Sequence, residues 1–176
     1  MRQTVLPWLD DWQWRQHGRA VLWALCWMCS AGASASTLWH GVVTHVSDGD
    51  TVWVRPLGGG VARKLRLQGI DAPERCQLWG PQASTALHVL LLSQVVQVQS
   101  LGQDSYGRTL AHVFYQGVDV GGWMVANGLA WSYRFQGQPG PYDAQQAQAQ
   151  ALQRGLFSQS AALNPYAFRR LYGGCP

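Results

Sequence analysis

Short runs of β-branched and aromatic residues, each ended by a turn rich in glycine or aspartate, constrain this 176-residue chain more than any other feature. Such runs are typical of partly buried strands. Five strands are predicted, at residues 39–46, 51–55, 61–70, 95–101 and 109–115. Helical spacing predicts three helices, from residue 81 onward, at 120–127 and at 141–154. This order predicts an α+β, mainly β domain: a five-stranded Greek-key barrel of the OB type with about three helices.

The composition is that of a globular domain with unusually little charge. Hydrophobic residues make up 47% and charged residues 12% of the chain, against about 25% charged residues in an average soluble domain. No uninterrupted apolar run reaches the roughly 18 residues of a membrane-spanning helix, and disorder, collagen and coiled coil are excluded. The net charge of +4 permits acidic partners without requiring them. Glu74 is the only glutamate, beside eight aspartates, so its position is of particular interest.

The first 35 residues have the pattern of an export signal. Arginines precede an apolar stretch at residues 20–30, and small residues at Ala33 and Ala35 follow it. This order predicts a signal peptide at 1–35, with cleavage after an A-x-A segment. The remaining domain, 36–176, is then exported and is periplasmic or secreted. Two alternatives are an uncleaved segment that holds the protein at the membrane, and a first amphipathic helix of the domain.

Two cysteines remain after the predicted signal peptide is removed. Cys26 and Cys29 lie within its apolar stretch, whereas Cys76 and Cys175 belong to the domain. Exported proteins fold where thiols are oxidised, so an even number of cysteines there favours pairing. A disulfide between Cys76 and Cys175 is predicted, with two free thiols as the alternative.

Acidic and basic residues concentrate at three predicted turns. The first contains Asp48 and Asp50, the second extends over residues 66–74, and the third over residues 104–108. Carboxylates on neighbouring turns are the ligands that a hard cation such as Ca²⁺ prefers. Arginines beside them have the fork geometry that binds a phosphate through two hydrogen bonds. Each turn alone is ordinary turn chemistry, and it is their joint occurrence in this order that predicts a site.

With these motifs the chain closely resembles the staphylococcal-nuclease-like (thermonuclease) family. The segments that carry the resemblance read VSDGDTVWV (46–54), LRLQGIDAPE (65–74), WGPQAS (79–84), DSYGR (104–108) and NGLAWSY (127–133). The resemblance extends over about residues 39–170. It implies a Ca²⁺-dependent phosphodiesterase on an OB barrel that hydrolyses DNA and RNA.

The resemblance also implies roles for individual carboxylates. Asp50 and Asp71 look like the two side chains that bind Ca²⁺, and the backbone carbonyl of Ala72 looks like a further ligand. Asp48 looks like a group that does not bind the metal directly but orients the metal or its waters. Glu74 looks like the carboxylate that activates or positions the attacking water.

Two arginines complete the implied catalytic set. Arg66 and Arg108 look like the pair that grips the scissile phosphate and stabilises its added negative charge. Loss of one such donor typically costs about 10²–10³ in rate, so Arg66→Ala or Glu74→Ala is predicted to nearly silence the enzyme and to leave the fold intact.

The chain departs from the family pattern in two respects. The loop between Glu74 and Gly80 is shorter. The family's lysine-rich surface is also missing, which leaves Arg63, Arg75 and Arg134, with Arg154 as a further candidate, to track the phosphate backbone. Tyr133 is predicted to stack on a base. The predicted partner is single- or double-stranded DNA or RNA, bound by a monomer without a stable protein partner. Alternatives are a non-catalytic OB module that binds nucleic acid, and an OB domain that binds carbohydrate or protein.

Overall fold

The computed structural model describes residues 37–160 and 162–175, which belong to one compact unit, Ser34–Pro176. The predicted signal peptide lies outside the described residues. Within the described part of the chain, no helix combines the length and apolar character that crossing a membrane requires.

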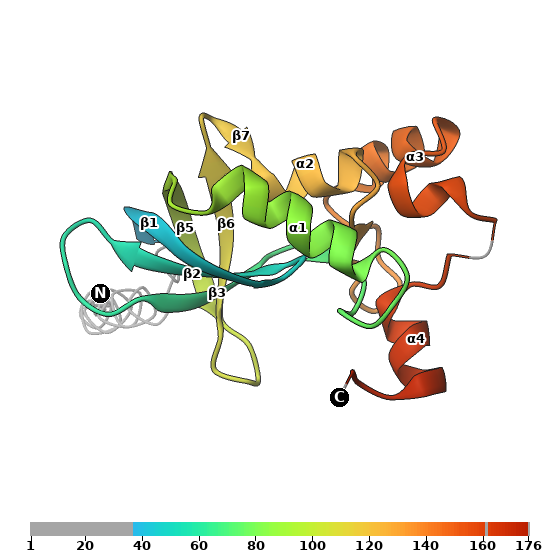
Figure 1. The fold of residues 1–176 in the computed structure, drawn as a ribbon, viewed down its shortest axis with the longest axis horizontal. Coiled ribbons are helices and arrows are strands. Elements are labelled where there is room, and N and C mark those ends of the chain that lie inside the picture. The colour runs from blue at the N-terminus through green and yellow to red at the C-terminus, as the bar shows by residue number, and fades with distance from the viewer. Residues whose placement is uncertain (1–36, 161, 176) are drawn as a thin grey trace, which may run out of the picture. The chain divides into compact units, whose positions relative to one another are not determined.

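Five strands form the body of this unit (Figure 1). They are β1 (Thr37–Asp48), β2 (Thr51–Pro56), β3 (Arg63–Leu67), β5 (Val95–Gln103) and β6 (Thr109–Tyr115). They pair in the order β3-β2-β1-β5-β6, and a parallel pairing of β3 with β6 closes the barrel. Closure pairs the edge strands that an open sheet would leave exposed. The five-stranded, mainly β barrel predicted from the sequence is therefore confirmed.

Three short strands lie outside the barrel ladder. The predicted strand at 61–70 divides into β3 and β4 (Ile70–Asp71) because a turn at residues 68–69 interrupts it. β4 pairs with β8 (Trp131–Ser132), and β7 (Val118–Asp119) extends the sheet beyond β6. The β4–β8 pair brings two distant parts of the chain together beside the barrel.

Four α-helices and one 3₁₀ helix accompany the strands in the described residues. They are α1 (Gly80–Leu91), α2 (Val120–Ala126), α3 (Asp143–Ala151), η1 (Gly155–Ser158) and α4 (Pro165–Tyr172). The first three correspond to the predicted helices. The fourth helix, α4, was not among the predicted helices, and Pro165 is its only buried residue. Figure 1 places α4 beside the loop that precedes α1.

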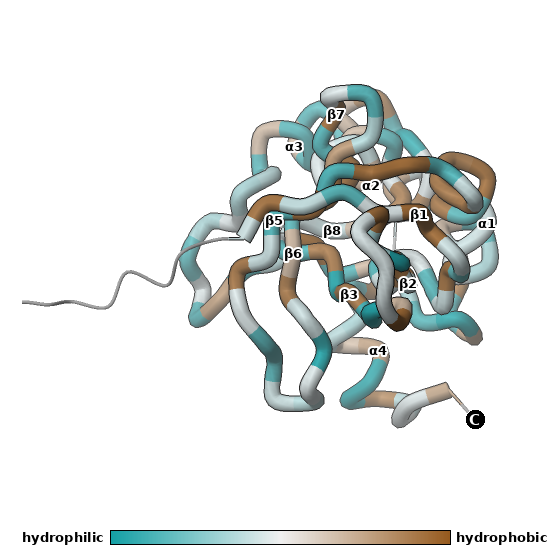
Figure 2. Tube along the Cα trace, turned by 90° about the vertical axis from the view of Figure 1, so that its left-hand side faces the viewer, coloured by the Kyte–Doolittle hydropathy of each residue, from teal (hydrophilic) through white to brown (hydrophobic). Residues whose placement is uncertain are grey.

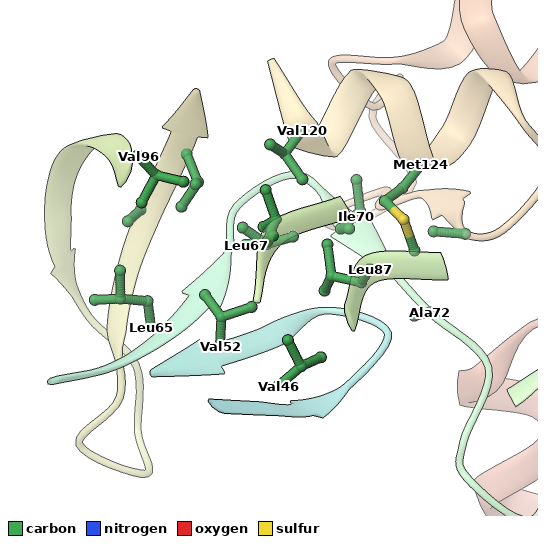
Figure 3. Close-up of a cluster of buried hydrophobic side chains, with 14 of the residues drawn as sticks. Val46, Val52, Leu65, Leu67, Ile70, Ala72, Leu87, Val96, Val120 and Met124 are labelled. Atoms are coloured by element: carbon green, nitrogen blue, oxygen red, sulfur yellow. The ribbon is translucent and has the colours of Figure 1, made fainter. Parts of the chain in front are cut away.

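The core fills the barrel and continues onto α1 and α2. Val52 and Leu65 from the strands lie with Leu87 of α1 and Met124 of α2 in one fully buried cluster (Figure 3). The tip of the β5–β6 hairpin is polar by comparison, and Figure 2 colours it white to hydrophilic teal. The core thus fixes the strand ends, and the polar turns that extend from those ends are free to carry chemistry.

Candidate active site

The β1–β2 turn presents two carboxylates in a fixed arrangement. The backbone N–H of Asp50 donates to Asp48 Oδ1 at 3.0 Å, and the Thr51 hydroxyl donates to Asp50 Oδ1 at 2.9 Å. Gly49 between them is required by close packing, since a Cβ there would lie 2.7 Å from the Cβ of Ala72. The turn therefore packs directly against the segment that follows β4.

Strand register places Arg66 between two buried carboxylates. Arg66 lies opposite Thr51 in the β2–β3 ladder, which brings its guanidinium to Asp50, and the two form an ion pair. The other terminal nitrogen, Nη2, is 3.2 Å from Asp71 Oδ1. Asp50 and Asp71 are only 5% and 6% exposed, so this arginine compensates charges that water cannot reach well. We call Asp50, Arg66 and Asp71 the inner cluster.

The inner cluster and its neighbour Asp48 carry more negative than positive charge. Burial, followed by the nearby charge of Asp50, raises the pKa of Asp48 to about 6. Burial also raises the pKa of Asp71, against the opposing effect of two arginines. For Arg66, burial alone would lower the pKa, but the charges of Asp50 and Asp71 outweigh it and the pKa rises. A region in which buried carboxylates resist ionisation favours the binding of another cation.

The Arg108 side chain is held by its own loop. Asp104 accepts backbone N–H groups of Tyr106 and Arg108, each at 2.9 Å, and its second oxygen accepts Arg108 Nε at 2.7 Å. The parallel β3–β6 pairing, which sets Arg66 opposite Leu110, brings this loop to the same end of the barrel. Arg66 thus lies on β3, and Arg108 lies in the loop directly before the neighbouring strand β6.

Glu74 lies on the tight loop between β4 and α1. Its backbone N–H donates to Gln77 Oε1 at 3.2 Å, and its carbonyl accepts the Gln77 N–H at 2.8 Å. The loop folds back so closely that a Cβ at Gly80 would collide with the carbonyl oxygen of Glu74. Glu74 follows Ala72 by two residues, and it lines the same cavity as the inner cluster.

One charged residue of this site, Arg169 of α4, is absent from the set predicted from the sequence. Arg169 Nη1 donates to Glu74 Oε1 at 2.6 Å, and Nη2 lies 3.6 Å from Asp71 Oδ2. The available signal was the sequence Asn164-Pro165, a helix start, followed by two arginines. It could indicate a helix but not where that helix packs.

These groups surround one cavity of about 860 Å³. Its lining includes both aspartates of the inner cluster, Asp48, Glu74, Arg108 and Arg169. Exposed aromatic rings stand on its rim, with Tyr133 43%, Phe135 63% and Tyr106 83% exposed. Tyr133 reaches the rim because its N–H bonds to the Gly69 carbonyl at 2.9 Å, next to β4.

The arginines predicted to track the phosphate backbone are separated by the fold, and Arg134 and Arg154 do not line the cavity. Arg75 lines the cavity, next to Glu74. Arg63 does not belong to that lining, and its guanidinium lies over the ring of Trp39, 5.3 Å from the centroid. The structure therefore groups Arg75, but not Arg63, with the other predicted residues.

The two cysteines of the domain meet beside the cavity. Cys76 and Cys175, which are 99 positions apart in sequence, are joined by a disulfide with their Cα atoms 5.7 Å apart. This bond links the Glu74 loop to the segment that follows α4.

The oxygen donors of the inner cluster are of the chemical type that a hard cation prefers. Among the described residues, no group of three or more His, Cys, Asp or Glu side chains is arranged to hold a metal ion together. Asp50, Asp71 and the Ala72 carbonyl offer oxygen ligands alone, and Ca²⁺ completes such partial sets with water or substrate oxygens.

Carboxylates and arginines converging on a cavity at one end of an OB-type barrel define a class of phosphate-processing sites. Residues 64–159 match the family described as staphylococcal nuclease homologue. The matched segment contains Arg66, Asp71, Glu74 and Arg108. The chain belongs to the staphylococcal nuclease family, and it is a nuclease.

Several curated relatives support this assignment. A protein of Shigella flexneri named micrococcal nuclease is 36% identical over 165 residues, which cover 86% of this chain and 91% of the relative. An uncharacterized endonuclease of Haemophilus influenzae is 36% identical over 128 residues, 73% of this chain and 71% of its own. The Escherichia coli protein ParB is 34% identical over 150 residues, 77% and 84% of the two chains.

Proposed function

We propose that this nuclease is a Ca²⁺-dependent phosphodiesterase that hydrolyses both DNA and RNA. The observation that carries the proposal is the inner cluster, two buried carboxylates with an arginine between them at the base of a large cavity. Asp50, Asp71 and the Ala72 carbonyl would hold the ion. When bound, Ca²⁺ would supply positive charge next to the phosphate oxygens.

In the proposed mechanism the side chains of this chain position three participants. Glu74 accepts a hydrogen bond from the attacking water and directs it at the phosphorus atom. Arg66 and Arg108 donate hydrogen bonds to the nonbridging oxygens, where negative charge increases in the transition state. Arg66 pairs with Asp50 and Asp71 in the structure, and it would be released toward the phosphate where Ca²⁺ compensates these two carboxylates. Tyr133 on the rim stacks on a base and aligns the strand.

Hydrolysis of single-stranded DNA and of RNA by the purified protein tests this proposal. We expect cleavage of both substrates with Ca²⁺ and none after a chelator is added. Glu74→Gln should lower kcat by about 10²–10³. Asp119→Asn is the matched control, because it makes the same carboxylate-to-amide change at a residue that does not line the cavity. Binding without cleavage under both conditions would indicate a non-catalytic module instead.

We also propose that residues 1–35 direct export and are cleaved, and that the domain acts as a monomer in the periplasm or outside the cell. The disulfide between Cys76 and Cys175 supports an oxidising compartment. Cell fractionation followed by N-terminal sequencing tests this proposal. Recovery from the membrane fraction with the N-terminus intact would favour the uncleaved anchor.

A further inference from the structure

Helix α4 brings a further arginine, Arg169, to the site. Arg169 donates to Glu74 Oε1 at 2.6 Å although 95 residues separate the two in sequence. The same guanidinium lies 3.6 Å from Asp71 Oδ2. One planar group therefore bridges two carboxylates to which the proposed function gives different tasks, water activation for Glu74 and metal binding for Asp71.

Two further attachments lead from the two ends of α4 to the loop that carries Glu74. The disulfide joins Cys76 to Cys175. On the other side of the helix, Gln77 Nε2 donates to the Leu163 carbonyl at 2.7 Å. Cys76 and Gln77 are two and three residues after Glu74, so the helix and the loop are fastened to each other at both ends of α4. Movement of α4 would change the surroundings of Glu74 directly.

Stability does not explain this arrangement. The side chains of Arg169 and Glu74 are 41% and 27% exposed, and ion pairs of this kind stabilise a fold by only about 0–1 kcal/mol. An arginine fork, in contrast, limits the rotamers of a carboxylate by bonding it in one plane. Burial lowers the pKa of Arg169, but the bond to Glu74 and the charge of Asp71 outweigh it, so the arginine stays charged.

We propose that Arg169 is a positioning residue that holds the Glu74 carboxylate where it directs the attacking water, and that the Cys76–Cys175 disulfide keeps α4 in place for this task. The inference rests on the proposed role of Glu74. It differs from phosphate binding, the role given to Arg66 and Arg108, because both terminal nitrogens of Arg169 are directed at carboxylates.

Steady-state kinetics of Arg169 variants of the full-length protein test the proposal. Arg169→Ala should lower kcat by about 10–100-fold, the usual cost of losing a group that orients a reacting ligand, and should change KM little. Arg169→Lys should recover part of kcat because it keeps the charge. Arg170→Ala is the matched control, since Arg170 is the next residue of α4 and lies over Tyr166. It should behave as wild type.

A double-mutant comparison separates positioning from direct catalysis. In a Glu74→Gln background, Arg169→Ala should cause no further loss of kcat, because the group it positions has already been disabled. Affinity for a fluorescent single-stranded oligonucleotide, measured in chelator, should be unchanged by Arg169→Ala. A full additional loss of kcat, or a clear loss of oligonucleotide affinity, would overturn the proposal in favour of a phosphate contact.

The failure of this inference can be distinguished from failure of the proposed function. If wild type is active and Glu74→Gln is impaired while Arg169→Ala matches Arg170→Ala, Arg169 has no positioning role and the function stands. If wild type is inactive with Ca²⁺, the proposed function is wrong. If wild type is active with Ca²⁺ but Glu74→Gln is fully active, the roles of Glu74 and Arg169 are wrong and the Ca²⁺-dependent function stands. Thermal unfolding of each variant shows whether a lower kcat reflects loss of folded protein. If Arg169→Ala is unfolded, kcat of Arg169→Lys is used instead, because lysine disturbs the helix less.

Discussion

The two groups of charged residues at the cavity are built in opposite ways. The inner cluster joins residues at most 21 positions apart, on elements that share the barrel and its short extension, and its carboxylates are nearly inaccessible to water. The outer pair, Glu74 with Arg169, joins residues 95 positions apart and is partly exposed. A disulfide and one side-chain hydrogen bond, rather than a strand ladder, attach α4.

This difference predicts which group of residues affects stability and which affects activity. Buried charges at strand ends are fixed by the core and cannot move without cost, which suits groups that must present a constant set of oxygens to a cation. The exposed pair contributes little to folding and can be adjusted independently. Perturbing the inner cluster should therefore change stability and activity together, whereas perturbing the outer pair should change activity almost alone.

The largest effect is expected from Arg66→Ala. Activity should fall by about 10²–10³ through loss of a phosphate donor. The fold should persist, but the free energy of unfolding should drop by about 1–3 kcal/mol, because Asp50 and Asp71 lose their buried partner. Denaturant unfolding measures the second effect. An unchanged unfolding midpoint would remove the distinction between the inner and outer groups.

Gly80→Ala should act next most strongly, and on the outer pair. The added Cβ meets the Glu74 carbonyl, so the loop must shift. A displacement of about 1 Å at a catalytic group costs up to about 10²-fold in kcat. Gly58→Ala is the control, since a Cβ there meets nothing within 4 Å. Equal kinetics of the two variants would show that the Glu74 loop tolerates displacement.

Reduction of the disulfide should have a smaller effect than loss of Arg169 itself. Freed from Cys76, α4 keeps the Gln77 bond but samples other positions, so kcat should fall severalfold. Cys175→Ser should reproduce this result without reductant. Reduction should not lower kcat further in Arg169→Ala, and an additive loss there would mean that the disulfide acts on the site by another route.

The smallest effect concerns Ca²⁺ and thermal stability. A ligand that binds only the folded state raises stability, by about 2.7 kcal/mol at 100 times its Kd. We therefore expect Ca²⁺ to raise the Tm of the wild type, to leave that of Asp50→Asn unchanged, and to raise that of Arg169→Ala nearly as in wild type. Loss of the Ca²⁺-induced shift in Arg169→Ala would place the outer pair within the metal site.

Sequence reasoning was most successful where local pattern and strand register suffice. The turn at Asp48 and Asp50 and the loop at 104–108 were both recognised, because their hydrogen bonds are made within a few residues. Arg63 could not be separated from Arg75 in this way. Both are arginines near the site in sequence, but strand pleat and the Trp39 ring direct Arg63 elsewhere.

The sequence by itself determined the order of the strands, the barrel class and the residue types that gather at its turns, since alternation and turn chemistry are local properties. Only the tertiary structure decided that α4 returns to the loop after β4 and places Arg169 on Glu74. A helix with one buried residue carries almost no pattern that says where it docks. Its position depends on contacts that exist only once the barrel and its loops have formed.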